Sequence, residues 1–216
     1  MLNFILSTLI LLTSFFQQKE DNFKLQNGDL IFQESCKGEM GDAIKDVTAG
    51  IAGYNFTHVG IVSIDSITNR IYVIEATHPK VCITPLEDYL HPAKETCSPK
   101  SVVGRLKPAY QHLIAQALSE ADNLIGKDYD DAFDLQNDQY YCSELIYDIL
   151  LKANNGTAVF PLNIMTFKSK DTGEYSPNWV THFKKQGISI PEGEKGINPG
   201  AMSQQADVID IVHYYK

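Results

Sequence analysis

The sequence predicts an α+β fold in which one antiparallel sheet packs against helices. Short apolar runs bounded by Gly, Asn and Asp fill residues 27–106, and apolar residues recur at helical spacing in residues 108–153. Two of the runs are also close enough in sequence to form a hairpin. With 216 residues, 44% of them hydrophobic, the chain has the size of one globular domain.

The first half of the chain is expected to be rich in strands. Residues 27–32 form a turn that leads into a short buried strand. A stretch rich in small and polar residues follows, with a short helix expected at residues 44–49. Residues 57–64 and 70–76 are then the two strands of the hairpin, joined by a turn at residues 65–69.

The later elements alternate between strands and helices. They are a strand leading into a short helix at 81–89, a strand at 101–106, a helix at 110–125 that Gly126 ends, a helix that begins at Cys142, a short helix at 179–183 and a final strand at 208–214. Residues 168–177 are expected to form a loop. A loop of this C-terminal part is expected to face the substrate, because binding residues often lie on loops.

Cys142 is the most informative residue, because it lies where a loop becomes an amphipathic helix. The apolar residues that follow it at helical spacing are Leu145, Ile146, Ile149, Leu150 and Ala153. In the first turn of a helix, backbone N–H groups lack partners and the helix dipole favours a thiolate over a thiol. Cys142 is therefore the candidate nucleophile. The alternative is an inert core cysteine, since free cysteines are commonly buried.

His58 and Glu75 are the candidate partners of this cysteine. Period-two alternation puts His58 on one face of the first hairpin strand and Glu75 on one face of the second, each among mostly apolar residues. A carboxylate in such surroundings is costly without a charged or hydrogen-bonding partner, and His58 is the nearest candidate. Taken alone, His58 would fit a structural histidine and Glu75 a strand end that reaches solvent.

Four cysteines permit two disulfides, but a nucleophilic Cys142 must stay free. Of the remaining three, Cys36, Cys82 and Cys97, the last two could close a loop of modest length, and the sequence leaves this pairing open.

No cofactor or metal is expected. A zinc site built from Cys82, His91 and Cys97 would lack the paired spacing typical of such sites. The acidic loop at residues 128–138 supplies many oxygen atoms but not the ordered spacing of a calcium loop, so a solvated loop is the better interpretation.

The N-terminal residues 1–18 predict a signal peptide for export. An apolar run of about 16 residues ends abruptly at polar residues, which is too short for a comfortable membrane span and typical of a secretory signal. The alternative is an uncleaved helix near the membrane, which would keep the protein at the cell envelope. Residues 19–216 would form the single catalytic domain, located in the periplasm or at the envelope.

The net charge of −9 argues against nucleic acid as a partner, because no run of Lys and Arg offers a patch for phosphates. The local cluster at Lys184 and Lys185 fits a solvated helix face. The charge does not distinguish between small substrates.

Four segments in order resemble the YiiX/YaeF-like enzymes, which are circularly permuted papain-fold amidases related to the NlpC-type cell-wall peptidases and to lecithin retinol acyltransferase. The segments are Asn27-Gly28-Asp29-Leu30-Ile31-Phe32, Thr57-His58-Val59-Gly60-Ile61-Val62, Val73-Ile74-Glu75-Ala76 and Tyr141-Cys142-Ser143-Glu144-Leu145. The stretch 190–200 is also similar to the C-terminal part of the family. Permutation explains why His58 precedes Cys142 in the chain.

The resemblance implies a permuted papain-like fold and a catalytic trio. Cys142 would be the nucleophile, His58 the base and then the acid, and Glu75 the group that orients the imidazole. The backbone N–H of Cys142 would stabilise the oxyanion, with the side chain of Tyr141 or Gln33 as candidates for a second donor.

The expected function is therefore that of an exported cysteine hydrolase that cleaves an amide bond through an acyl-thioester. Peptide stems of the bacterial cell wall are the expected substrate class. A second hypothesis keeps the same trio but makes the acyl group lipidic, with apolar residues of the segments 50–56 and 160–167 lining the pocket. A third is a domain that binds a cell-wall or lipid ligand without turning it over. The sequence does not indicate an oligomeric state.

Overall fold

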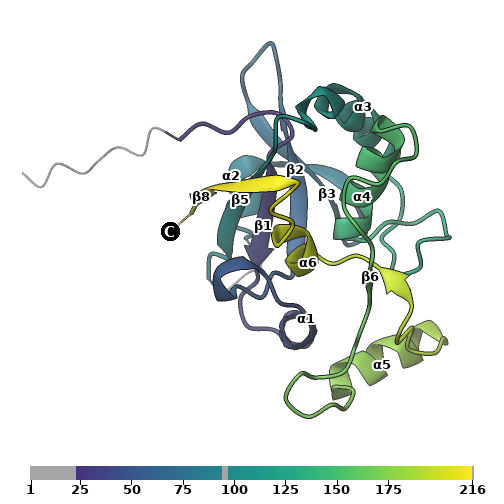
Figure 1. Cartoon of the computed structure of the whole chain (residues 1–216). Helices are drawn as coiled ribbons and strands as arrows, with labels where there is room; N and C mark the ends of the chain where they lie inside the picture. Colours follow the sequence, from purple (N-terminus) through teal and green to yellow (C-terminus); the bar gives the residue numbers. More distant parts are fainter. Residues whose placement is uncertain (1–22, 94–96, 216) are drawn as a thin grey trace, which may run out of the picture.

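The computed structural model describes residues 23–93 and 97–215 (Figure 1). Its centre is a six-stranded antiparallel sheet with the strand order β4-β3-β2-β1-β5-β8. The strands are β1 (Leu30–Glu34), β2 (His58–Ile64), β3 (Ile71–Thr77), β4 (Lys80–Pro85), β5 (Lys100–Leu106) and β8 (Ile209–Tyr214). The predicted α+β fold with an antiparallel sheet is confirmed.

The helices and the remaining short elements complete the fold. They are α1 (Glu39–Val47), the 3-10 turn η1 (Ile51–Gly53), α2 (Leu86–Leu90), the 3-10 turn η2 (Gln111–Leu113), α3 (Ile114–Leu124), α4 (Cys142–Ala153), α5 (Pro177–Gln186), α6 (Pro199–Ser203) and the strand pair β6 (Asn163–Ile164) and β7 (Lys195–Gly196). Helix α4 packs against α3 on one side and against β2 and β3 on the other (Figure 1).

Two predicted helices begin earlier than expected. Helix α1 already begins at Glu39, where the sequence suggested Ile44. Helix α5 spans ten residues instead of the expected five, because its ends are defined by capping. The hydroxyl of Ser176 accepts a hydrogen bond from the Trp179 amide, and Gly187 ends the helix with a left-handed φ of 71°.

The alternation predicted for the hairpin separates two apolar layers. Val59 and Ile61 of β2 lie in the main core, which α3 and α4 cover. Val62 and Val73 instead belong to a second cluster, on the face that α2 covers through Tyr89. Because His58 shares the period-two position of Val62, the hairpin places it on the α2 side, at the first residue of β2.

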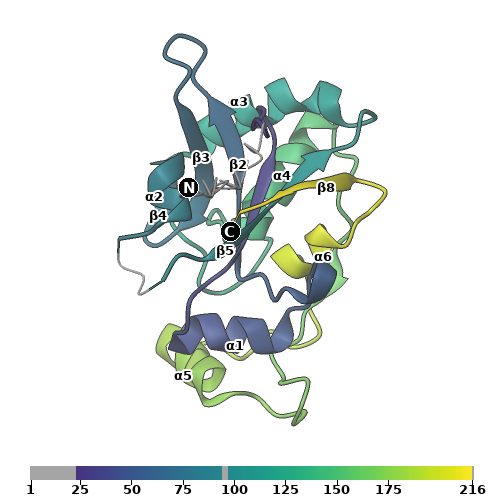
Figure 2. The ribbon, with the colours of Figure 1, turned by 90° about the vertical axis from the view of Figure 1, so that its left-hand side faces the viewer.

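Helices α1 and α5 form a third apolar cluster, remote from α3 (Figures 1 and 2). Ala43 of α1 packs there with Trp179 and Phe183 of α5, and the Trp179 indole donates a hydrogen bond to the Ala43 carbonyl at 3.2 Å. The stretch between β1 and β2, which contains α1, thus packs in an apolar cluster separate from the main core.

The predicted signal peptide at residues 1–18 lies outside the described residues. Within residues 23–93 and 97–215, no helix has the length and apolar character needed to cross a membrane.

Candidate active site

Cys142 is the first residue of α4, as predicted. The preceding residue, Tyr141, has an extended backbone, and the Glu144 carboxylate accepts a hydrogen bond from its amide at 3.2 Å. This bond fixes the point at which the loop becomes a helix. The Cys142 side chain is buried and is not part of a disulfide, so a free thiol lies in the first turn of the helix.

His58 and Glu75 form the predicted pair. The register of β2 and β3 pairs Ile61 with Ile74, so Glu75 lies opposite Gly60 and diagonally next to His58. The His58 Nε2 and Glu75 Oε2 atoms are 2.6 Å apart. Both side chains are largely buried, which makes this a shielded ion pair.

Cys142 and Glu75 both act on the pKa of His58. The burial of His58 opposes its charged form, but hydrogen bonds to Cys142 and to Glu75 and the charges of both partners outweigh it and raise the pKa of His58 to about 10. Burial likewise opposes the charged form of Glu75, yet the hydrogen bond and charge of His58 lower the pKa of this carboxyl. Nε2 contacts Glu75, so Nδ1 is the ring nitrogen that Glu75 does not occupy.

Two residues that the sequence did not single out complete the surroundings of this pair. The Thr84 hydroxyl of β4 donates to Glu75 Oε1 at 2.5 Å. The ring of Tyr89, in α2, lies with its centroid 5.7 Å from that of His58. The period-two pattern of residues 81–85 could have placed Thr84 on a strand face, but not next to Glu75, because the pairing of β3 with β4 determines that contact.

Gly60 lies in a crowded position between Val73 and Tyr89. A Cβ atom at this position would overlap the Val73 side chain and lie 3.3 Å from Tyr89 Cε2. A larger residue would therefore displace Val73 first and also crowd the ring next to His58.

The two candidates for a second oxyanion donor differ in their contacts. Gln33 uses both hydrogens of its amide nitrogen, one to the Tyr89 carbonyl at 2.9 Å and one to the Ser101 hydroxyl at 3.1 Å. It has none left for an oxyanion, so this prediction is wrong. The Tyr141 oxygen accepts a hydrogen bond from the Ile197 amide, and burial raises the pKa of Tyr141 well above its usual range, so the phenol keeps its proton.

An apolar pocket opens beside Cys142. It is lined by Ile44, Val47, Thr48, Thr57, Tyr129, Phe133, Tyr141, Cys142, Ser143, Ile164, Met165, Thr166, Phe167, Trp179, Ile197, Asn198 and Pro199. None of these residues is Asp, Glu, Lys, Arg or His. The predicted segment 160–167 supplies part of the lining, whereas 50–56 does not. Helix α1 supplies a wall that the sequence did not predict.

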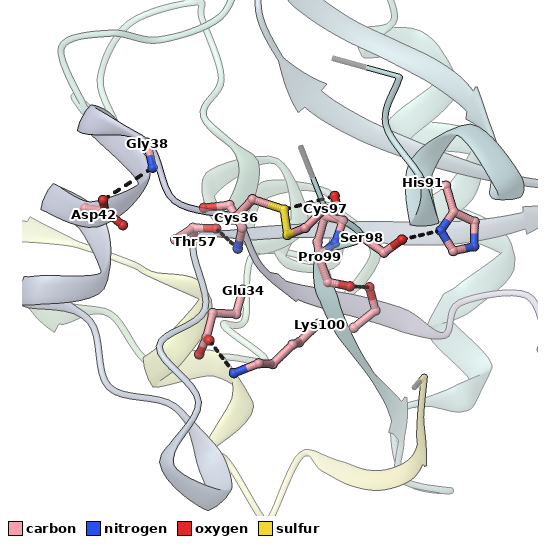
Figure 3. The surroundings of a disulfide bond; sticks show 12 residues. Glu34, Cys36, Gly38, Asp42, Thr57, His91, Cys97, Ser98, Pro99 and Lys100 are labelled. Atoms are coloured by element: carbon pink, nitrogen blue, oxygen red, sulfur yellow. Dashed lines mark hydrogen bonds and ion pairs between the residues drawn. A yellow bond between two sulfur atoms is a disulfide. The ribbon is translucent and has the colours of Figure 1, made fainter. Parts of the chain in front are cut away.

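A disulfide holds the chain at the start of α1, between Cys36 and Cys97 (Figure 3). The pairing of Cys82 with Cys97 that the sequence left open does not form, because Cys97 is bonded to Cys36 and Cys82 is free. The physical reason is the strand order: β1 and β5 are neighbours, with Glu34 opposite Lys100, so the segment after β1 meets the segment before β5.

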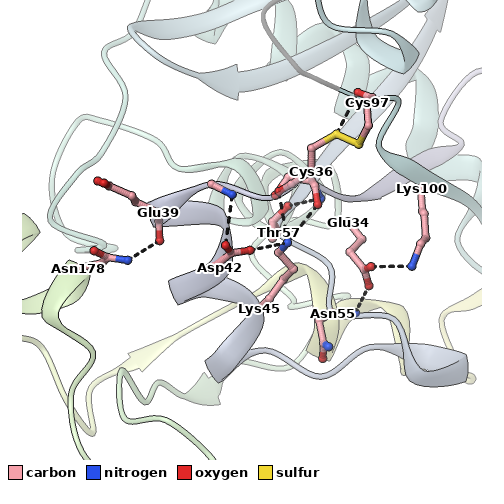
Figure 4. Close-up of polar contacts among 12 residues, drawn as sticks. Glu34, Cys36, Glu39, Asp42, Lys45, Asn55, Thr57, Cys97, Lys100 and Asn178 are labelled. Atoms are coloured by element: carbon pink, nitrogen blue, oxygen red, sulfur yellow. Dashed lines mark hydrogen bonds and ion pairs between the residues drawn. A yellow bond between two sulfur atoms is a disulfide. The ribbon is translucent and has the colours of Figure 1, made fainter.

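Polar contacts tie α1 to its surroundings as well (Figure 4). The Lys45 ammonium donates to the carbonyls of Ser35 and Cys36, each at 3.2 Å, and pairs with Asp42 at 2.8 Å. The Asn178 side chain of α5 donates to the Glu39 carbonyl at 2.7 Å. The pocket wall is thus fixed from both ends of α1.

Among the described residues, no group of three or more His, Cys, Asp or Glu side chains is arranged to hold a metal ion. The Asp130 carboxylate in the acidic loop accepts hydrogen bonds from the amides of Ala132 and Asp134, so it organises its own loop.

The chain is similar to known proteins over most of its length. Residues 24–211 match the family model described as permuted papain-like amidase enzyme, YaeF/YiiX, C92 family. A protein of Escherichia coli (strain K12) named uncharacterized protein YiiX is 32% identical over 203 residues, which cover 92% of this chain and 88% of the relative.

A crystal structure of yiiX from Escherichia coli O157:H7, described as a metalloprotein, superposes with a TM-score of 0.69 at 24% identity. The match covers 89% of this chain and 99% of the other. It confirms the fold.

Proposed function

The chain belongs to the YaeF/YiiX family of permuted papain-like amidases, and on that premise we propose that it is a cysteine hydrolase that cleaves an amide bond. The observation that carries the proposal is the 2.6 Å contact between His58 and Glu75, together with the interaction with Cys142 that helps to raise the pKa of His58. It joins a thiol at a helix start, a base and a carboxylate, which is the arrangement that nucleophilic catalysis requires.

The raised pKa of His58 supports a protonated imidazole at neutral pH. In the proposed mechanism the nucleophile is the Cys142 thiolate. The thiolate adds to the substrate carbonyl carbon, and the C–N bond breaks as His58 gives its proton to the leaving amine. An acyl-thioester on Cys142 remains. Water then attacks this carbonyl and gives a proton to His58, and the carboxylic acid leaves as the thiolate re-forms. Glu75 keeps the imidazole oriented throughout.

The oxyanion of the tetrahedral intermediate needs preorganised donors. The Cys142 amide at the start of α4 is the first donor in our proposal. The Tyr141 phenol is the second, because it lines the pocket and keeps its proton.

The substrate class of the proposed enzyme is peptide stems of the bacterial cell wall, with export directed by residues 1–18. Two observations support this substrate class: the family to which the chain belongs, and the apolar run at its N-terminus. An enzyme that acts at the cell envelope needs such a run as an export signal. If the substrate is a cell-wall peptide, we expect charged groups next to the cleaved bond.

A second candidate has a specific observation in its favour: the pocket beside Cys142 is apolar and aromatic. Residues such as Phe167, Trp179 and Ile44 offer no partner to a charged peptide end, but they fit an apolar acyl group. In this version the same trio would cleave or transfer a fatty acyl chain.

Turnover of two matched substrate panels tests these candidates. One panel contains muropeptides, and the other contains fluorogenic amides with acyl chains of two to twelve carbons. Each substrate is incubated with the wild type, with Cys142→Ser and with His58→Ala. Cleavage of either panel that both substitutions abolish, with circular dichroism unchanged, would support the hydrolase. Ligand binding without turnover, equal in wild type and Cys142→Ser, would instead indicate a binding domain.

A further inference from the structure

The Glu75 carboxylate is held from both neighbouring strands. Its Oε2 atom contacts His58 of β2 at 2.6 Å, and its Oε1 atom accepts a hydrogen bond from Thr84 of β4 at 2.5 Å. Only 7% of the residue is exposed. Each carboxylate oxygen therefore has one strong protein partner, and the carboxylate plane is fixed by two bonds instead of one.

The sheet register produces this arrangement. Val73 pairs with Thr84 and Glu75 pairs with Cys82, so Thr84 is a diagonal neighbour of Glu75 on the same sheet face. His58 is the diagonal neighbour on the other side. The β-branched Thr84 side chain has few rotamers in a strand, which keeps its hydroxyl aimed at the carboxylate.

Thr84 has a single hydroxyl hydrogen, and it goes to Glu75. The Cys82 sulfur lies 3.6 Å from the Thr84 oxygen, so its S–H is the donor in that contact. Hydrogen bonds in such a chain polarise one another, from Cys82 through Thr84 to Glu75. The titratable groups around Glu75 are thus Cys82 on β4, His58 on β2 and the Tyr89 phenol of α2.

We propose that Thr84 is a positioning residue of the hydrolase: its hydroxyl fixes Glu75 so that the carboxylate keeps the His58 ring directed at Cys142. The inference rests on the proposed function. Without this hydroxyl, Glu75 Oε1 would lose its donor, and the carboxylate could rotate away from the imidazole. The Thr84 hydrogen bond also helps to lower the pKa of Glu75, so its loss makes the carboxylate easier to protonate.

The test compares Thr84→Val with Thr84→Ser, and with Thr157→Val as a matched control on an exposed residue after α4. Alkylation of Cys142 by iodoacetamide is followed between about pH 4 and 9, together with turnover of a cleaved substrate. We expect Thr84→Val to lower kcat about tenfold with KM unchanged and to move the acidic limb of both profiles upward by about one pH unit. Thr84→Ser should restore both, and Thr157→Val should change neither.

The outcomes separate this inference from the proposed function. A Thr84→Val variant that is less stable to urea but keeps the wild-type pH profile would overturn the positioning role. The hydrolase would still stand if Cys142 of the wild type reacts fast at pH 6 and His58→Ala abolishes this reactivity. If wild-type Cys142 reacts as an ordinary thiol, the proposed function fails first.

Discussion

Replacing Glu75 with Gln is the perturbation that tests the trio most directly. The amide keeps the size of the side chain, so the variant should fold, but it removes the charge next to His58. The two atoms that now form the pair are 2.6 Å apart and largely shielded from solvent. The change therefore isolates the electrostatic contribution of the carboxylate.

The magnitude follows from this geometry. Charge centres roughly 4 Å apart interact by about 4 kcal/mol at an effective dielectric constant of about 20. At about 1.4 kcal/mol per pKa unit this corresponds to about three units, and to about a thousandfold in rate if the interaction acts in the transition state. The pKa of His58, now about 10, should therefore fall to about 7 in Glu75→Gln.

The assay is the rate of Cys142 alkylation between pH 5 and 9, followed by peptide mass mapping, beside NMR titration of the His58 ring. In the wild type we expect selective labelling at pH 6, where an ordinary thiol is mostly protonated, and an imidazolium that persists beyond pH 8. Glu75→Gln should move the imidazole titration into the neutral range and slow labelling at pH 6. The control is Glu87→Gln on the exposed surface of α2. Identical profiles for Glu75→Gln and the wild type would refute the reasoning.

Three further predictions concern stability. Cys97→Ser removes a cross-link to Cys36 that spans 61 residues, and should lower the free energy of unfolding by about 2–4 kcal/mol relative to the oxidised wild type, measured by urea denaturation; the reduced wild type should match the variant. Gly60→Ala should cost about 1–3 kcal/mol by overlap with the side chain across the hairpin; an unchanged melting temperature would contradict this. The pKa of His58 is raised in the folded state, so protonation of His58 stabilises the fold fully below about pH 6.5, and this contribution is lost as the pH rises towards 10. The pKa of Glu75 is lowered in the folded state, so ionisation of Glu75 stabilises the fold above about pH 4.5, and this contribution is lost on acidification. The stability difference between wild type and His58→Ala should therefore be largest between about pH 4.5 and 6.5, and a flat difference across pH 5–9 would argue against the ion pair.

The sequence determined the elements whose signals are local. The 3.6-residue spacing of apolar residues after Cys142 defined the start of α4, and the two-residue alternation of the hairpin brought His58 and Glu75 to one face. Both patterns depend on residues close together in the chain, so they are readable without the fold. The order of the four segments that resemble the family also predicted the permuted topology.

The tertiary structure decided what depends on strand order and on packing between distant segments. The adjacency of β1 and β5 selected Cys36 as the partner of Cys97, and the register of β3 with β4 brought Thr84 to Glu75. The docking of α1 on α5 made the apolar wall beside the thiol. Such contacts join residues far apart in the chain, and local periodicity carries no information about them because many pairings bury the same apolar surface equally well.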